Sequence, residues 1–310
     1  MTNFSIIIPH HNIPDLLQRC LASIPSCEDI QVIIVDDTSS AENVAKVKNI
    51  EREHPSFEFY YNQEGKGAGH ARNIGLDHAI GKWLIFADAD DMFTENIKGL
   101  MDKYGDSGFD IIYFGNISKD SLSLMPARRH VDRMRDFKRL ANHPKSLRRW
   151  LTCEYTEPWG KFIKRELLAD NNIAFEESKV ANDFRFSTLC ALTANEIGHD
   201  LTPLYCVTVR QGSLCNDMYD AEEKMISRLK VYHGIQEIYL NVHIPRRPFN
   251  EMLQDLLLKG KLSDNILNQI DTFFSYKKSQ IYRMAFSCIF KKILRRMFRI
   301  LSIPVYAYHL

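Results

Sequence analysis

The chain has 310 residues and a formal net charge of +1, and 45% of its residues are hydrophobic and 25% charged. This composition is typical of a soluble globular protein with its own core, and the charge balance argues against a polycation that binds nucleic acid. The seven cysteines include no Cys-x-x-Cys pair, which favours reduced thiols in a cytoplasm. The sequence has no long apolar run, so we expect no signal peptide and no membrane span.

Short apolar strands alternate with helices over the first part of the chain. The strands are predicted at residues 4–8, 30–35, 57–61, 83–87 and 110–114. Apolar residues at helical spacing predict one helix that begins at Pro14 and another over residues 68–80. This alternation predicts a doubly wound, mostly parallel α/β sheet flanked by helices. From about residue 219 the pattern turns helical, so we expect an α/β domain over residues 1–218 and a helical region over residues 219–310.

Polar residues directly follow three of the predicted strands. Residues 10–12 (His-His-Asn) follow the first strand, residues 36–37 (Asp-Asp) the second, and residues 88–91 (Asp-Ala-Asp-Asp) the fourth. Ligands of doubly wound sheets bind beyond the carboxyl ends of the strands. We therefore expect these three polar clusters to converge on one edge of the sheet.

The cluster after the fourth strand is strongly acidic, with Asp88, Asp90 and Asp91 close together. Like charges repel one another unless a cation neutralises them, and a hard divalent cation does so with oxygen ligands. Mg²⁺ or Mn²⁺ held by one or two carboxylates usually completes its shell with substrate phosphates. The cluster therefore predicts a divalent metal and a diphosphate substrate. The alternative is that Asp91 caps the next helix.

Four segments carry a resemblance to a known family, namely residues 5–12, 35–39, 69–76 and 86–91. In their order and spacing they resemble family-two glycosyltransferases of the GT-A fold. The resemblance implies an inverting enzyme that moves a sugar from a nucleotide-diphosphate sugar, with a UDP-sugar favoured, to the hydroxyl of a saccharide or lipid-linked saccharide. It also implies bacterial surface polysaccharide synthesis.

The resemblance assigns residues 1–115 to the nucleotide-sugar half of the domain. By position, Asp36 or Asp37 would hydrogen-bond the nucleobase, and Pro9 and His11 would line the base pocket. The family usually has tyrosine at the position of His11, and an Asp-Gly-Ser motif where this chain has Asp-Thr-Ser.

The same resemblance assigns the contacts with the diphosphate. Arg72 would lie near the phosphates or the ribose, and Asp88 would contact the ribose or the metal. Asp90 would ligate the metal, Mn²⁺ or Mg²⁺, that bridges both phosphates. Arg210, in a segment that resembles a later family motif, would close over the diphosphate.

Residues 116–218 correspond to the acceptor half. The segment 157–165 resembles the family's Pro-Trp-Gly-Lys segment, which makes Trp159 and Lys161 candidates for acceptor binding. Asp183 occupies the place of the catalytic base, although Asn182 replaces the glutamate that usually precedes it. Two alternatives remain, since Trp159 is also a plausible core aromatic and Asp183 a plausible helix cap.

Two basic regions are candidates for contact with anionic partners. Residues 277–303 place Phe286, Ile289, Ile293, Met297 and Ile300 on one helical face and most Lys and Arg residues opposite. This pattern is typical of a helix lying on an anionic membrane, which would make the protein peripheral at the inner face of the plasma membrane. The alternative is a docked helix with a solvated basic face. Residues 118–150 are also basic, either as a solvated surface or as a lip that attracts an anionic substrate or lipid.

Three rival functions remain open from the residues alone. Residues 67–72 partly resemble a dinucleotide-binding Gly-x-Gly motif of an NAD-type oxidoreductase, but they follow the third strand and the last glycine is missing. A sugar nucleotidyltransferase would also need a metal and a diphosphate. A non-catalytic carbohydrate- or nucleotide-binding module would not need Asp183.

Overall fold

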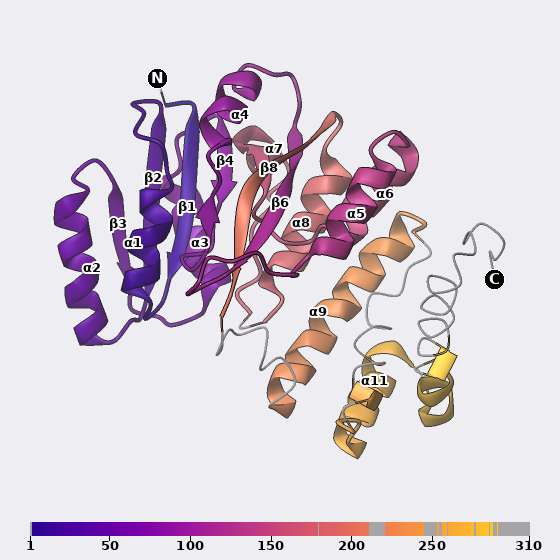
Figure 1. The fold of residues 1–310 in the computed structure, drawn as a ribbon. Helices are drawn as coiled ribbons and strands as arrows, with labels where there is room; N and C mark the ends of the chain where they lie inside the picture. The colour runs from indigo at the N-terminus through magenta and orange to yellow at the C-terminus, as the bar shows by residue number, and fades with distance from the viewer. Residues whose placement is uncertain are drawn as a thin grey trace. The chain divides into compact units, whose positions relative to one another are not determined.

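The computed structural model describes residues 2–178, 180–210, 221–244, 253, 256–258, 260–275, 277–284, 286–287 and 290. The chain divides into two compact units, Met1–Asn216 and Asp217–Leu310. The amino-terminal unit is built on a single sheet with helices packed against it (Figure 1). Each unit has its own apolar core.

The sheet of the amino-terminal unit has the strand order β3-β2-β1-β4-β7-β6-β8-β5. Its strands are β1 Phe4–His10, β2 Ile30–Asp37, β3 Glu58–Asn62, β4 Trp83–Phe86, β5 Met92–Phe93, β6 Ile111–Asp120, β7 Lys161–Lys164 and β8 Ile197–Val209. Strands β1 to β4 are mutually parallel, and β6 is parallel to β8. β7 runs antiparallel to both β4 and β6, and β5 is antiparallel to β8. The described strands other than β5 and β7 therefore share one direction, as the predicted mostly parallel sheet requires.

Strand β1 marks the point where the strand order reverses, because it pairs with β2 on one side and with β4 on the other. Chain segments that leave these strands diverge to opposite sides, which opens a binding site at the carboxyl edge. All side chains of β1 and β4 are buried. Their continuous apolar runs follow from this burial, since helices cover both faces of a parallel sheet.

The helices of this unit are α1 Pro14–Ala22, α2 Ala41–Glu53, α3 Ala68–His78, α4 Ile97–Tyr104, α5 Val131–Leu140, α6 Pro144–Glu154, α7 Arg165–Asp170 and α8 Asn182–Thr193. Helix α1 begins at Pro14 as predicted, with Asp15 in its first turn, where the helix dipole favours an acid. α1 contacts α2, and α3 and α7 both contact α8. Separate helix groups of this kind are typical of a doubly wound fold.

The described residues of the carboxyl-terminal unit form helices, which include α9 Glu222–Asn241 and α11 Asp264–Phe274. Leu229, Ile266 and Ile270 belong to its small core. Within the described part of the chain, no helix combines the length and hydropathy needed to cross a membrane. The predicted basic tail, residues 277–303, lies largely outside the described residues. Phe286 of its predicted apolar face is described and is 61% exposed.

Candidate active site

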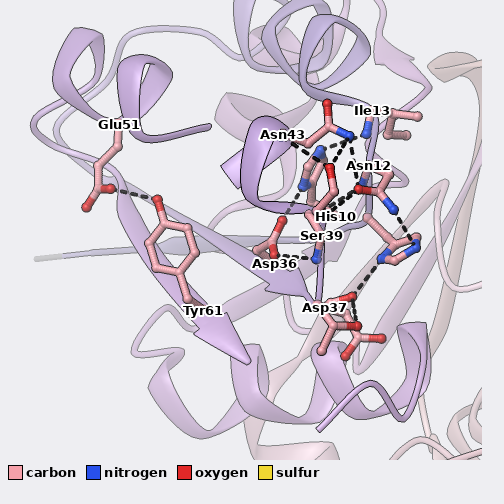
Figure 2. Close-up of polar contacts among 12 residues, drawn as sticks. His10, Asn12, Ile13, Asp36, Asp37, Ser39, Asn43, Glu51 and Tyr61 are labelled. Carbon is pink, nitrogen blue, oxygen red and sulfur yellow. Dashed lines mark hydrogen bonds and ion pairs between the residues drawn. The ribbon is translucent and has the colours of Figure 1, made fainter. Parts of the chain in front are cut away.

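His10 and Asp36 form a buried pair at the carboxyl ends of β1 and β2. Nδ1 of His10 lies 2.7 Å from Oδ2 of Asp36, and the backbone N–H of Ile13 donates to Nε2 of the same ring (Figure 2). Nε2 therefore carries no proton, and Nδ1–H donates to Asp36. Burial opposes ionisation of Asp36, but the bonds from His10 and Ser39 outweigh it and lower its pKa. Asp36 thus ties the two strand ends together.

Asp37 is the second carboxylate at this edge, and the chain satisfies each of its oxygens once. Oδ1 accepts from the Asn62 side chain at 2.7 Å, and Oδ2 accepts the N–H of Gly67 at 2.8 Å. The exposed His11 ring donates from Nδ1 to the carbonyl of Asp37 at 2.7 Å, while Nε2 accepts from Asn12 at 3.0 Å. These bonds hold the His11 ring fixed beside Asp37.

Asn12 joins the β1 loop to the start of α2 (Figure 2). Its side-chain oxygen accepts from the Ser40 N–H at 2.7 Å and from the Asn43 side chain at 3.0 Å. Its own N–H donates to the Ser39 hydroxyl at 2.8 Å, and its φ of 57° is left-handed, a conformation that asparagine tolerates. Pro9 lies just before this loop and is buried in β1.

Arg72 links α3 to the acidic cluster. One guanidinium nitrogen donates to Oδ1 of Asp88 at 2.6 Å, and another donates to Oδ1 of Asn182 at 3.0 Å. The guanidinium also lies 5.3 Å from the centre of the Phe175 ring. Burial raises the pKa of Asp88, while the charge of Arg72 opposes this rise. Arg72, Asp88 and the first turn of α8 are thereby brought together as the sequence predicts for a common site.

Asp90 pairs with Arg210, whose Nε lies 2.9 Å from its Oδ2. The peptide carbonyl of Asp90 is held as well, because it accepts from Arg19 and from the Thr208 hydroxyl, both at 2.6 Å. The predicted metal ligand Asp90 and the predicted diphosphate contact Arg210 thus pair with one another.

Asp91 does not cap a helix, so that alternative is wrong. Its Oδ1 accepts the backbone N–H of Thr208 in β8 at 2.6 Å, and α4 begins only at Ile97 after Asn96. Burial, together with the charges of Asp88 and Asp90, raises its pKa well above the ordinary value. Asp91 therefore fastens the acidic loop to β8.

Asp183 lies in the first turn of α8, while Ala181 occupies the cap position, so the structure does not support the alternative that it is the helix cap. Burial raises its pKa to about 6, opposed by the charge of Arg72 and assisted by those of Glu157 and Asp88. Its neighbour Asn182 accepts from Arg72 at 3.0 Å, and Arg72 also donates to Asp88, so the first turn of α8 contacts the Arg72–Asp88 pair.

Trp159 and Lys161 are both buried in the amino-terminal unit. Trp159 is 3% exposed and stacks on Tyr205 with ring centres 5.1 Å apart. Lys161 has no exposed surface, its Nζ donates to the carbonyl of Tyr155 at 2.8 Å, and burial lowers its pKa to about 8. These contacts give both residues a packing role, and their part in acceptor binding stays a prediction.

The carboxylate oxygens of Asp88 and Asp90 fit a divalent cation only if the substrate supplies further ligands. Among the described residues, no three His, Cys, Asp or Glu side chains form a group that could hold a metal. Asp88 and Asp90 each engage one oxygen with an arginine. Mg²⁺ and Mn²⁺ are commonly held by one or two carboxylates together with phosphate oxygens, and these two residues fit that arrangement.

Three residues at the site carry no signal in the sequence. Arg19 donates to Asp90 from α1, Thr208 binds the acidic loop from β8, and the Tyr205 hydroxyl accepts the N–H of Asp88 at 2.7 Å. Each contact joins residues far apart in the chain. Only the pairing of β8 with its neighbours brings Tyr205 and Thr208 there, and local patterns do not reveal that pairing.

The glycines that resembled a dinucleotide motif have structural roles instead. Gly67 has a φ of 94° and donates its N–H to Asp37. A Cβ on Gly69 would lie 2.1 Å from the carbonyl oxygen of Glu176, so only glycine allows α3 to approach this segment. The glycines thus serve the turn and the helix packing.

Curated glycosyltransferases are similar to this chain in sequence. The chain is 28% identical over 130 residues to the GalNAc(5)-diNAcBac-PP-undecaprenol beta-1,3-glucosyltransferase of Campylobacter jejuni, which covers 39% of this chain and 42% of that protein. It is 23% identical over 219 residues to glycosyltransferase GlyA of Streptococcus pneumoniae, covering 68% of this chain and 31% of GlyA. The chain thus spans less than half the length of these curated relatives.

Solved structures show the same fold. S. aureus TarS 1-349 in complex with UDP-GlcNAc has a TM-score of 0.64 and 21% identity, and the match covers 91% of this chain and 84% of TarS 1-349. The mannosyltransferase PcManGT from Pyrobaculum calidifontis, in complex with GDP-Man and Mn²⁺, has a TM-score of 0.54 and 16% identity, covering 96% and 87% of the two chains. Residues 5–168, more than half of the chain, match the family model described as glycosyl transferase family 2. The chain belongs to this family of glycosyltransferases.

Proposed function

We propose that the protein transfers a sugar from a UDP-sugar to a hydroxyl of a saccharide or lipid-linked saccharide, with inversion at the anomeric carbon. The observation that carries this proposal is the position of Asp183. Asp183 follows Asn182, whose side chain accepts from Arg72 at 3.0 Å, so a carboxyl group with a raised pKa lies in the helix turn that contacts the Arg72–Asp88 pair. The polyprenol-linked substrate in the name of the Campylobacter relative supports the lipid-linked acceptor.

The nucleobase would bind at the ends of β1 and β2. The exposed His11 ring is held by two hydrogen bonds and offers a flat face to a base, and Pro9 of β1 would line the same pocket. Asp37 is the better base partner, because it is 7% exposed against 2% for Asp36, whose carboxylate is paired with His10. Carboxylate oxygens have two lone pairs each, so Asp37 can accept another donor from the base.

The diphosphate would bind between Arg72 and Arg210. Asp88 and Asp90 would hold Mn²⁺ or Mg²⁺, and such an ion when bound stabilises the charge of the leaving nucleoside diphosphate as a Lewis acid. Arg72 and Arg210 each form an ion pair with one of these carboxylates. On donor binding, both guanidinium groups can turn to the phosphate oxygens, which a guanidinium can bind with two parallel hydrogen bonds.

Asp183 would act as the general base. With a pKa of about 6 it is mostly ionised at neutral pH, and it is a stronger base than an ordinary aspartate. It would take the proton of the acceptor hydroxyl as that oxygen attacks the anomeric carbon. One base and one direct displacement invert the configuration at that carbon.

The test is a panel of nucleotide sugars with Mn²⁺, read by release of nucleoside diphosphate and by the anomeric configuration of the product. We expect one donor class to be turned over and excess chelator to stop the reaction. Release of pyrophosphate would instead identify a nucleotidyltransferase, and binding of NADH in a fluorescence titration an oxidoreductase. Full activity in Asp183→Asn, or activity that persists in chelator, would contradict the mechanism.

A further inference from the structure

The turn that follows β6 exposes large apolar side chains to solvent. Within this apolar turn (residues 120–126), Leu122 is 93% exposed, Met125 65% and Leu124 43%. Single exposed apolar residues are ordinary, but clusters of them mark contact surfaces. Ile80, in the segment that follows α3, is an isolated case of the ordinary kind, with 63% exposure.

The apolar turn is closed by its own hydrogen bonds. Oδ1 of Asp120 accepts the N–H of Leu122 at 3.2 Å and that of Ser123 at 2.9 Å. The backbone of Asp120 accepts from Leu124 at 3.0 Å and donates to Met125 at 2.8 Å. The turn therefore holds its apolar side chains outward in a fixed geometry.

The backbone conformation of Leu124 is unfavourable for the stability of the fold. Its φ of 55° is left-handed, a conformation that glycine and asparagine adopt readily and that costs about 1–2 kcal/mol for most other residues. Leu124 is also 43% exposed to solvent. Neither folding nor solubility explains a leucine here, so the residue points to a contact with something outside the chain.

The charge around the apolar turn is positive. Residues 117–129 contain three basic residues, Lys119, Arg128 and Arg129, and one acid, Asp120. Asp120 is engaged by the turn itself, and Arg128 is exposed. Protruding apolar side chains with basic neighbours are typical of surfaces that enter the interface of an anionic bilayer.

The apolar turn is also fastened to the candidate active site. The N–H of Ser121 donates to the Val209 carbonyl at 2.8 Å, one residue before Arg210. Arg19 donates to the carbonyl of Ser121 and to that of Asp90, both at 2.6 Å. Any surface that receives the turn therefore lies next to the edge that carries the acidic cluster.

We infer that Leu122, Leu124 and Met125 insert into the headgroup interface of an anionic bilayer. This contact would bring the acidic edge to acceptors that are anchored in the membrane. The bilayer contact itself does not require the proposed transferase reaction, whereas the delivery of a lipid-linked acceptor rests on it. A second protein is the competing occupant, and the excess of basic over acidic residues favours the lipid.

The first experiment measures partitioning of the full chain onto vesicles, without donor or acceptor. The vesicles are phosphatidylcholine alone or phosphatidylcholine mixed with phosphatidylglycerol. We expect Leu122→Ser combined with Met125→Ser to weaken binding to the mixed vesicles about tenfold, because two apolar side chains are lost from the interface. The control Ile80→Ser removes a side chain that is 63% exposed, close to the 65% of Met125, and this variant should bind like the parent.

Leu124→Asn separates a binding defect from a folding defect. Asparagine suits the left-handed backbone, so the melting temperature should be unchanged or higher while vesicle binding falls. Wild-type binding in both Leu124→Asn and the double serine variant would overturn the inference.

The second experiment reads insertion at the turn itself. Leu122→Trp places an indole at the tip, and Ile80→Trp places one at the control position. Brominated lipids in the mixed vesicles should quench the new fluorescence at 122 and leave that at 80 unchanged. Absence of quenching at 122 would reject the membrane contact. A serine variant that alters self-association in sedimentation without altering vesicle binding would identify a protein interface instead.

Discussion

Burial raises the pKa of Asp183 to about 6, and this value determines how activity depends on pH. In the proposed reaction the base must be ionised, so kcat/KM should fall as the pH drops through about 6. Asp183→Asn should lower kcat by about 10²–10⁴-fold, the usual contribution of a general base, and leave UDP binding intact. Steady-state kinetics across pH, with calorimetry of UDP binding, provide the check. Loss of UDP binding would show a role in donor contact instead.

The same pKa predicts the stability of that variant. Because the folded pKa of about 6 exceeds the ordinary 3.8, the folded state binds more protons than the unfolded state between these values, and stability falls as the pH rises through them. Asparagine does not ionise. Asp183→Asn should therefore melt at a higher temperature than the parent at pH 8, and the difference should vanish below about pH 4. A lower melting temperature at pH 8 would instead indicate a structural role for the carboxylate.

The ion pair between Arg210 and Asp90 predicts competition with the metal. Removal of the guanidinium in Arg210→Gln frees one oxygen of Asp90, so Mn²⁺ should bind about fivefold more tightly without nucleotide, the equivalent of ~1 kcal/mol for a partly exposed pair. Transfer should nevertheless slow, because the charge on the diphosphate is lost. Electron paramagnetic resonance of free Mn²⁺ measures the first effect. Unchanged or weaker Mn²⁺ binding would show that Asp90 is not a ligand.

At the scale of elements, two helical glycines should respond oppositely to alanine. A Cβ on Gly69 would meet the Glu176 carbonyl at 2.1 Å and the Asn182 Cβ at 2.9 Å, whereas one on Gly99 would meet nothing within 4 Å. Gly69→Ala should cost about 1–3 kcal/mol through overpacking and should weaken UDP binding, because α3 carries Arg72. Gly99→Ala should stabilise α4 by about 0.4–1 kcal/mol. Urea unfolding of both variants distinguishes these outcomes, and equal effects would contradict the close packing of α3.

Elements that are buried on both faces could be predicted from the sequence, and elements made by distant pairing could not. Strands β1, β2 and β4 are rich in apolar residues, α1 begins at Pro14, and α3 follows Gly67. In contrast, β5 contains only Met92–Phe93, and it exists because these residues pair with Cys206 and Tyr205. Strand β8 begins with polar residues, so its length depends on its long pairing with β6.

The candidate site divides in the same way. The clusters after β1, β2 and β4 could be predicted to meet, because parallel strands end at one edge. The burial and the hydrogen-bond partners of each side chain could not be predicted. Trp159 proved to be a buried aromatic, and Asp91 proved to bind Thr208, because both outcomes depend on contacts across the sheet.

For the whole molecule, the residues proposed for the donor, the metal and the base all belong to the amino-terminal unit. That unit includes the apolar turn and has a core of its own. The carboxyl-terminal unit carries the basic tail, with eight Lys and Arg residues and no acid between residues 277 and 299. The chain thus has two separate candidates for membrane contact, one mainly apolar and one mainly basic.

These two contacts should differ in their response to salt. Deletion of residues 277–310 should weaken flotation with anionic vesicles at low salt. The deletion combined with Leu122→Ser and Met125→Ser should weaken flotation more than either change alone, because two linked contacts reinforce one another. High salt screens the attraction of a basic segment to anionic lipid but spares apolar insertion. Salt should therefore reduce the binding of the parent and have less effect on the truncated chain. Unchanged flotation after truncation would exclude the tail, and equal salt sensitivity of both chains would mean that the remaining contact is also electrostatic.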